Sequence, residues 1–394
     1  MLGRLLLLAA ALLALGACEI NDRENLPGDA GSPAGDGSTA PPPDAGPSTS
    51  PDATALLAGD AADLAPDAAA GVAAPRFIGR FDDADPARPR FGFSGSAVEA
   101  RFSGTGVTLQ LDGSDSDVYT AVVDGTATTF STSASQQSYP LAQDLPAGEH
   151  RVLVWKNTEW FQGTGQFLGF QFVGGGSLLP VSAPARRLEF VGDSITCAYG
   201  NLGADQYCGF SSTTEDHYQG YAALTARALG ADESTICQSG IGVWRNYDGA
   251  TSGTMPDLYP LSYGDGPAWD FRSVPDAVLV NLGTNDWAQG TPDRAAFEAA
   301  YGSLLDSLRA RYPQAFLLMA VGPMLGGAEA ATAHAWLQGL ADARGAAGDH
   351  RVSVVDFAEQ DGSLGYGCDW HPSLATHQQM ADHLVQVLQG LLGW

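Results

Sequence analysis

The sequence has very little positive charge. Only 19 of its 394 residues are lysine or arginine, against 45 aspartate and glutamate residues, and Lys156 is the only lysine. The formal net charge is −26 at pH 7. Such a chain repels nucleic acids, acidic polymers and anionic membrane surfaces, because these carry the same sign of charge. We therefore expect a neutral substrate and no nucleic-acid partner.

Long apolar runs are also lacking after the first residues. The run 5–15 follows Arg4, is too short to span a bilayer and ends at Gly16-Ala17-Cys18. These features are typical of a secretory signal, and residues 15–18 also resemble a bacterial lipobox, in which the cysteine is acylated. The alternative is an ordinary signal peptide with a chance cysteine. We expect residues 1–18 to be a lipoprotein signal, and the protein to be an exported monomer, at the cell surface or in the periplasm, that touches the membrane only through Cys18.

Cysteine is scarce in the rest of the chain. Four cysteines remain, Cys197, Cys208, Cys237 and Cys368. An even number in an exported protein favours disulfides, although four cysteines allow three pairings. Cys197 with Cys208 closes the shortest loop and is the expected first pair. Cys237 and Cys368 then form a second pair or stay as buried thiols.

Aromatic residues are absent between Glu19 and Ala74, where Ala, Asp, Pro, Gly, Ser and Thr dominate. This composition buries too little apolar surface to offset the entropy of ordering, so residues 19–74 are predicted to be a disordered linker. Residues 75–181 instead contain short alternating segments, and Asp124-Gly125 after an apolar strand is a hairpin signal. Strands at this spacing without helical segments predict a small β-sandwich of the jelly-roll type.

Residues 185–394 alternate between apolar strands and amphipathic helices. This alternation predicts an α/β domain, a three-layer doubly wound parallel sheet with ligands beyond the carboxyl ends of its strands. A capping box over Ser212–Glu215 is expected to start a helix that runs to Leu229. The other expected strands are 187–191, 277–281, 315–321 and 352–357, and the other expected helices are 291–311, 329–344 and 376–392.

Four short polar segments follow a predicted strand or precede the last helix. They are residues 189–196, 237–242, 280–286 and 367–372. Ser194 follows a buried strand directly, and His371 lies just before the last helix. A serine becomes a strong nucleophile when an imidazole takes its proton, so we expect Ser194 as nucleophile and His371 as general base.

Ester hydrolysis also needs hydrogen-bond donors for the oxyanion of the tetrahedral intermediate. The candidates are the backbone N–H groups of Ser194 and Gly240 and the side-chain amide of Asn285, with the Gly242 N–H as an alternative to that of Gly240. The segments contain no zinc motif or nucleotide fingerprint in its proper context, and we expect no cofactor and no metal.

The four segments, in this order, resemble those of the GDSL, or SGNH, hydrolase superfamily. Gly192-Asp193-Ser194-Ile195, a later glycine, Gly283-Thr284-Asn285-Asp286 and a carboxyl-terminal histidine carry the likeness. Residues 75–394 are most similar to the acetyl esterases of carbohydrate esterase family two, which have a jelly roll before the hydrolase domain and a Gly-Cys-Asp-Trp-His-Pro stretch like residues 367–372. The resemblance implies a serine esterase that removes O-acetyl groups from polysaccharides of the xylan or glucomannan type.

The chain departs from the superfamily at the acid of the catalytic triad. Superfamily members commonly have an acidic residue three positions before the histidine, where this chain has Cys368. The nearest acid is Asp369, whose carbonyl or carboxylate is the candidate for orienting His371. Some family members work with a Ser–His dyad of that kind.

Two tryptophans flank the site segments, and two other functions remain open. Trp287 and Trp370 are candidates for stacking on a sugar ring, with the protein core as the alternative for each. The first rival function is a non-catalytic surface lipoprotein that binds glycans. The second is a GDSL lipase, or an esterase with another substrate.

Overall fold

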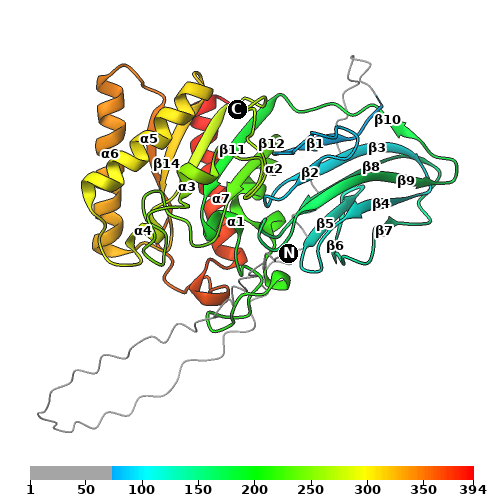
Figure 1. Cartoon of the computed structure of the whole chain (residues 1–394), viewed down its shortest axis with the longest axis horizontal. Helices are drawn as coiled ribbons and strands as arrows, with labels where there is room; N and C mark the ends of the chain where they lie inside the picture. Colours follow the sequence, from blue (N-terminus) through cyan, green and yellow to red (C-terminus); the bar gives the residue numbers. More distant parts are fainter. Residues whose placement is uncertain (1–72) are drawn as a thin grey trace, which may run out of the picture. The chain divides into compact units, whose positions relative to one another are not determined.

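The computed structural model describes residues 73–394. Its amino-terminal part consists of two antiparallel sheets (Figure 1). The first sheet has the order β1–β3–β8–β5–β6, with β10 paired to β3, and the second has the order β2–β9–β4–β7. The strands are β1 (Arg76–Ile78), β2 (Arg90–Phe91), β3 (Ala97–Gly104), β4 (Gly106–Asp112), β5 (Val118–Val123), β6 (Thr126–Ser131), β7 (Ser138–Ala142), β8 (Gly148–Lys156), β9 (Gly165–Val173) and β10 (Leu178–Leu179).

Alternating apolar residues of both sheets share one core, which includes Phe102, Leu109, Tyr119 and Val154. The predicted hairpin joins β5 to β6, and Asp124 and Gly125 both adopt positive φ values, 49° and 82°, as the tight turn requires. The predicted jelly-roll sandwich is confirmed by this arrangement.

The carboxyl-terminal part is built on a five-stranded sheet in the order β12–β11–β13–β14–β15, in which every pair is parallel. The strands are β11 (Arg186–Gly192), β12 (Ala231–Cys237), β13 (Ala277–Asn281), β14 (Phe316–Val321) and β15 (Val352–Asp356). The helices are α1 (Ser194–Cys197), α2 (Tyr221–Ala228), α3 (Met255–Leu258), α4 (Thr284–Trp287), α5 (Arg294–Arg311), α6 (Gly327–Ala346) and α7 (Leu374–Leu392), with short 3-10 helices at Ser212–Thr214, His217–Gln219 and Cys368–Trp370.

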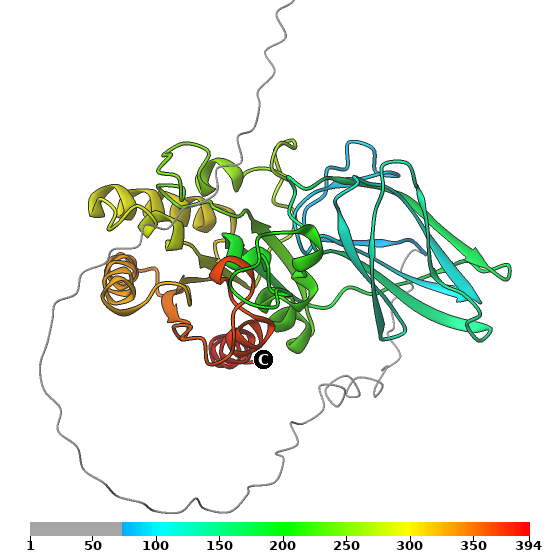
Figure 2. The ribbon, with the colours of Figure 1, turned by 90° about the horizontal axis from the view of Figure 1, so that it is seen from below.

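Successive residues of the buried strands face opposite layers. Val278 and Val280 pack in the core formed with α5 and α6, whereas Ala277 and Leu279 pack in the core formed with α2 and α7. Helices accordingly cover both faces of the sheet (Figure 2). The predicted three-layer architecture is therefore confirmed. β12 follows β11 on one side of it, and β13 to β15 follow on the other, so the strand order switches direction at β11. Open α/β sheets bind ligands beyond the carboxyl ends of their strands at such a switch point.

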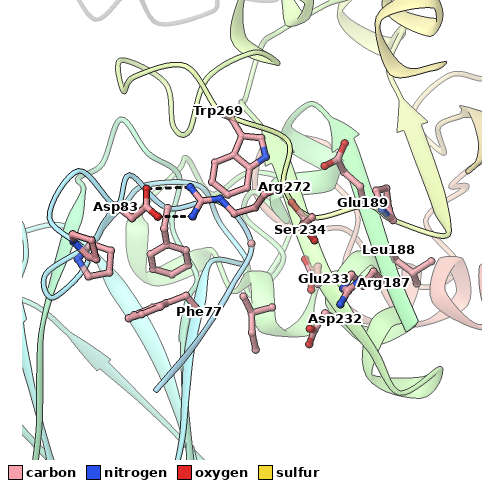
Figure 3. Close-up of a pocket in the computed structure, with 17 residues that line it drawn as sticks. Phe77, Asp83, Arg187, Leu188, Glu189, Asp232, Glu233, Ser234, Trp269 and Arg272 are labelled. Atoms are coloured by element: carbon pink, nitrogen blue, oxygen red, sulfur yellow. Dashed lines mark hydrogen bonds and ion pairs between the residues drawn. The ribbon is translucent and has the colours of Figure 1, made fainter. Parts of the chain in front are cut away.

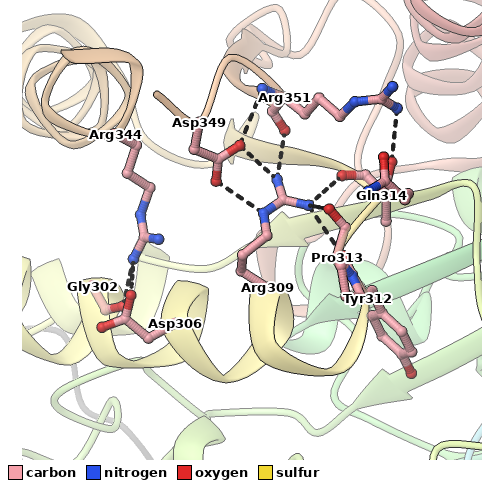
Figure 4. A network of polar contacts seen from close by, with 10 residues as sticks. Gly302, Asp306, Arg309, Tyr312, Pro313, Gln314, Arg344, Asp349 and Arg351 are labelled. Carbon is pink, nitrogen blue, oxygen red and sulfur yellow. Dashed lines mark hydrogen bonds and ion pairs between the residues drawn. The ribbon is translucent and has the colours of Figure 1, made fainter. Parts of the chain in front are cut away.

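A polar network around Arg309 fixes the carboxyl-terminal end of α5 (Figure 4). Arg309 donates to both carboxylate oxygens of Asp349, at 2.9 and 3.0 Å, and to the carbonyl oxygen of Ala315 at 2.7 Å. It thereby ties α5 to the segments that lead into β14 and β15.

Within residues 73–394, no helix is both long and apolar enough to cross a membrane.

One expected local structure is wrong, and one strand is missing from the expected set. Ser211, rather than Ser212, caps a single 3-10 turn, and the backbone becomes extended at Glu215. Both backbone groups of Asp216 bond to the side chain of Asn201, at 2.9 Å each, so this segment follows a neighbouring loop and α2 starts only at Tyr221. The missing strand is β12, whose sequence, Ala-Asp-Glu-Ser-Thr-Ile-Cys, has too few apolar residues to stand out.

The expected pairing of Cys197 with Cys208 is also wrong. Cys197 pairs with Cys237, and Cys208 pairs with Cys368. The reason is the parallel register of β11 and β12, which sets Gly192 beside Cys237 at the sheet edge where α1 begins. Loop length alone does not reveal this proximity, because it comes from tertiary structure.

Candidate active site

Ser194 is the first residue of the short helix α1, directly beyond the carboxyl end of β11. The preceding Asp193 caps this helix by accepting a hydrogen bond from the Ile195 N–H at 3.0 Å. Gly192 is required at the bend, because a Cβ there would collide with the Thr196 side chain and approach the Asn281 carbonyl oxygen to 2.9 Å. The strand, the glycine and the cap together fix the position of the serine side chain.

His371 lies opposite Ser194, with its Nε2 2.9 Å from the serine Oγ. Its Nδ1 is 3.0 Å from the backbone carbonyl oxygen of Asp369 and 3.2 Å from that of Cys368. These oxygens only accept, so Nδ1 carries the proton and Nε2 is free to accept one. The imidazole is thus oriented by backbone carbonyls and not by a carboxylate.

The backbone before His371 is held in an uncommon conformation. Asp369 and Trp370 have φ values of 51° and 63°, which are unfavourable for residues other than glycine. The Cys208–Cys368 disulfide and a 3.0 Å bond from the Asp369 N–H to the Cys208 carbonyl oxygen fasten this turn. The turn directs the Asp369 carbonyl at the imidazole and its carboxylate at the hydroxyl of Tyr199.

Tyr199 is a site residue that the sequence patterns do not single out. Its hydroxyl donates to Asp369 Oδ2 at 2.7 Å, and its ring lies 4.3 Å from the imidazole of His371, centroid to centroid. Burial lowers the pKa of His371, while the carbonyls of Asp369 and Cys368 raise it. Because the pKa is lowered overall, the imidazole stays neutral, as a general base must be, at pH values that reach below the ordinary histidine pKa of about 6.5. A signal for Tyr199 exists only in its spacing, five residues after the nucleophile.

The structure brings the oxyanion-hole candidates to the same sheet edge. Among the described residues, no protein group accepts a hydrogen bond from the Ser194 or Gly240 N–H. The Gly242 N–H, by contrast, donates to Asn246 Oδ1 at 3.0 Å, so Gly240 is the better candidate. Gly240 has a φ of 77°, and a Cβ there would meet the Tyr247 ring at 2.9 Å.

The Asn285 amide projects from α4 into the same region. Its Nδ2 donates to the Ile241 carbonyl oxygen at 2.8 Å and makes a longer contact of 3.3 Å with Asp193 Oδ2. Burial raises the pKa of Asp193 to about 7. The next residue, Asp286, accepts backbone N–H bonds from Val243, Trp244 and Arg245 at 2.9 to 3.0 Å, which fixes the loop beyond Gly240.

The two candidate stacking residues differ in their environments. Trp370 is 45% exposed beside Tyr207 and Tyr366, so it offers a ring to a ligand. Trp287 is only 4% exposed and packs against Phe297 and Trp336. Of the two alternatives for Trp287, stacking on a sugar or packing in the core, its burial favours the core beneath α5 and α6. Cys18 lies outside the described residues.

A crevice of about 340 Å³ lies elsewhere, between the jelly roll and the amino-terminal ends of β11 and β12 (Figure 3). Phe77 and Phe81 line it from the jelly roll, and Trp269 packs over Arg272, which pairs with Asp83. None of the candidate catalytic residues lines it. Within residues 73–394, no group of three or more His, Cys, Asp or Glu is placed to hold a metal ion.

Comparison with family models places the chain in a class of serine hydrolases. Residues 77–181 match the carbohydrate esterase 2 N-terminal family, and residues 190–379 match the GDSL-like lipase/acylhydrolase family. The chain belongs to carbohydrate esterase family two.

Individual relatives are similar over most of the chain. A cellulase/esterase, CelE, of Acetivibrio thermocellus is 42% identical over 81% of this chain, which spans 39% of that protein's length. An acetylxylan esterase/glucomannan deacetylase of Cellvibrio japonicus is 30% identical over 74% of this chain and 82% of its own length. The structure of a family two carbohydrate esterase from Clostridium thermocellum in complex with cellohexaose has a TM-score of 0.79 and 41% identity, covering 82% of this chain and all of that one.

Proposed function

We propose that this protein is a serine esterase that removes O-acetyl groups from neutral polysaccharides. The observation that carries the proposal is the 2.9 Å contact between Ser194 Oγ and His371 Nε2, with His371 Nδ1 held by a backbone carbonyl. A nucleophile next to an oriented base is the arrangement that acyl transfer requires.

In the proposed reaction, His371 takes the proton of Ser194 as Oγ attacks the acetyl carbonyl carbon. The negative charge that develops on the carbonyl oxygen is stabilised by the N–H groups of Ser194 and Gly240 and by the Asn285 amide, which exchanges its long contact with Asp193 for the oxyanion. The tetrahedral intermediate collapses, the sugar hydroxyl leaves with the proton from His371, and the acetyl group remains on Ser194. A water molecule, deprotonated by His371, then releases acetate in the same manner.

Three observations support a glycan as the substrate. Relatives are acetylxylan esterase/glucomannan deacetylases, and a similar structure holds cellohexaose. Trp370, Tyr207 and Tyr247 are exposed, and aromatic rings of this kind stack on sugars. The net charge of −26 favours a neutral polymer over an anionic lipid surface.

The proposal is tested with p-nitrophenyl esters of two to twelve carbons and with acetylated xylan and glucomannan, using Ser194→Ala as the blank. We expect kcat/KM to be highest for the acetyl ester and acetate to be released from at least one glycan. Equal or faster hydrolysis of esters of eight carbons or more, without acetate from any glycan, would establish a lipase instead. Glycan binding without hydrolysis of any ester would establish the non-catalytic alternative.

We also propose that the protein is exported and anchored through an acylated Cys18, with residues 19–74 as a spacer and a monomeric enzyme beyond it. The lipobox-like residues 15–18 support this, as do two disulfides, which are typical of oxidising compartments. Intact-mass analysis of the mature protein is expected to show an acyl mass at Cys18, and Cys18→Ser should abolish it. A mature protein that starts elsewhere, or that carries no acyl group, would refute the anchor.

A further inference from the structure

A buried carboxylate of the jelly roll reaches the loop that carries Gly240. Glu159 lies between β8 and β9 and is fully buried. Its Oε2 accepts the Ser239 N–H at 2.6 Å, and its Oε1 accepts the Ser239 hydroxyl. Both oxygens therefore bind the one residue that directly precedes Gly240.

The contact is reinforced on both sides. From the same jelly-roll loop, Trp160 Nε1 donates to Gln238 Oε1 at 3.0 Å. The chain's single lysine, Lys156, is fully buried and donates to the backbone oxygens of Thr158 at 2.8 Å and Glu159 at 3.2 Å, and to Asp117 Oδ1 at 2.6 Å. The loop that presents Glu159 is thus itself rigidly held.

The position of Ser239 decides where the Gly240 N–H points. That N–H lies in the peptide plane that joins the two residues, so rotation about the Cα–C bond of Ser239 turns it. Gly240 has a φ of 77° and no side chain, and therefore resists such a rotation poorly on its own. Two bonds to a buried carboxylate fix Ser239 at its N–H and at its hydroxyl.

We propose that Glu159 is a positioning residue that aligns the Gly240 N–H for the oxyanion, so that the jelly roll completes the oxyanion hole of the hydrolase. This inference rests on the proposed esterase function. It makes the two folded parts one catalytic unit instead of an enzyme with a detachable binding module. It also gives a physical reason for burying a carboxylate here, although burial raises the pKa of Glu159 to about 7 against the opposing effect of the bonds from Ser239.

The test compares Glu159→Ala with Glu159→Gln. Alanine removes both acceptors, whereas glutamine keeps an oxygen for the Ser239 N–H and an amide that donates to its hydroxyl. For Glu159→Ala we expect kcat on p-nitrophenyl acetate to fall about 10- to 100-fold with KM changed less than about threefold, because an oxyanion donor acts mainly in the transition state. Glu159→Gln should stay within about threefold of the wild type. Ser239→Ala, which keeps the N–H bond, provides a milder variant if Glu159→Ala does not fold, and should lower kcat about threefold to tenfold.

A second readout separates this inference from the proposed function. Diethyl p-nitrophenyl phosphate modifies an activated serine whatever the natural ester, and its phosphoryl oxygen needs the same donors. The rate of Ser194 modification should fall in parallel with kcat in Glu159→Ala. Glu149→Gln is the control, because Glu149 is a jelly-roll carboxylate that bonds Arg101 and not Ser239. Unchanged modification and kcat in folded Glu159→Ala, or equal losses in Glu159→Gln or Glu149→Gln, would overturn the inference. If the wild-type protein is modified at Ser194 but releases no acetate from any glycan, only the proposed function fails.

Discussion

Replacing Ser194 by alanine is expected to lower kcat on p-nitrophenyl acetate by at least about 10⁴-fold, because no other group can form the acyl intermediate. His371→Ala should cost about as much, since the serine is a weak nucleophile when no base accepts its proton. The two losses should not add in the double variant, because both residues act in the same step. The measurement is kcat and KM for each variant, with near-ultraviolet circular dichroism to show that the fold is retained.

Asp369→Asn is the matched control for this experiment. Asparagine keeps the backbone carbonyl 3.0 Å from His371 Nδ1 and changes only the side chain that Tyr199 contacts. We expect it to retain activity within about tenfold of the wild type, far from the roughly 10⁴-fold loss seen where a triad acid is neutralised. A loss beyond about 10³-fold in a folded Asp369→Asn protein would show that the carboxylate takes part. If folded Ser194→Ala retains more than a few per cent of the wild-type activity, the assignment of Ser194 as the nucleophile is refuted.

The sequence predicts the architecture well because hydrophobic periodicity is a local signal. The apolar strands at β11, β13 and β14 stand out, as does the Asp124-Gly125 hairpin. The proximity of Ser194 and His371 follows from one topological rule, that the carboxyl ends of parallel strands share an edge. Such features depend on composition and on the order of segments along the chain, and both can be read from the sequence.

The remaining features depend on which segments meet in three dimensions. β12 pairs beside β11 although its sequence is polar at four positions, and this pairing brings Cys197 to Cys237. Tyr199 contacts the site from a loop and is marked in the sequence only by its position five residues after Ser194. Glu159 contacts the site from a separate sandwich, and no spacing marks it. Burial cannot be read from the sequence either. Trp287 and Trp370 both flank site segments, yet their exposed fractions are 4% and 45%.

Asn285→Ala is the second substitution with a large expected effect. It removes one of three proposed oxyanion donors, and losing such a donor typically lowers kcat by about 10²- to 10³-fold, or about 2.7 to 4 kcal/mol. KM should change little, since the donor gains most of its interaction as charge develops on the carbonyl oxygen. The experiment is steady-state kinetics on p-nitrophenyl acetate, with urea unfolding to correct for any loss of stability from the bond to Ile241.

The control for Asn285 is its isosteric carboxylate. Asn285→Asp keeps the shape of the side chain but offers no donor when ionised, and it places a second acid beside Asp193, whose pKa burial already raises to about 7. Because two acids at this distance disfavour double ionisation, one of them should hold a proton near neutral pH, and kcat in Asn285→Asp should fall further as the pH rises and that proton is lost. Asn285→Ala should show no such added pH dependence. A folded Asn285→Ala protein within tenfold of the wild-type kcat would exclude the amide from the oxyanion hole and leave the backbone N–H groups of Ser194 and Gly240 as its only members.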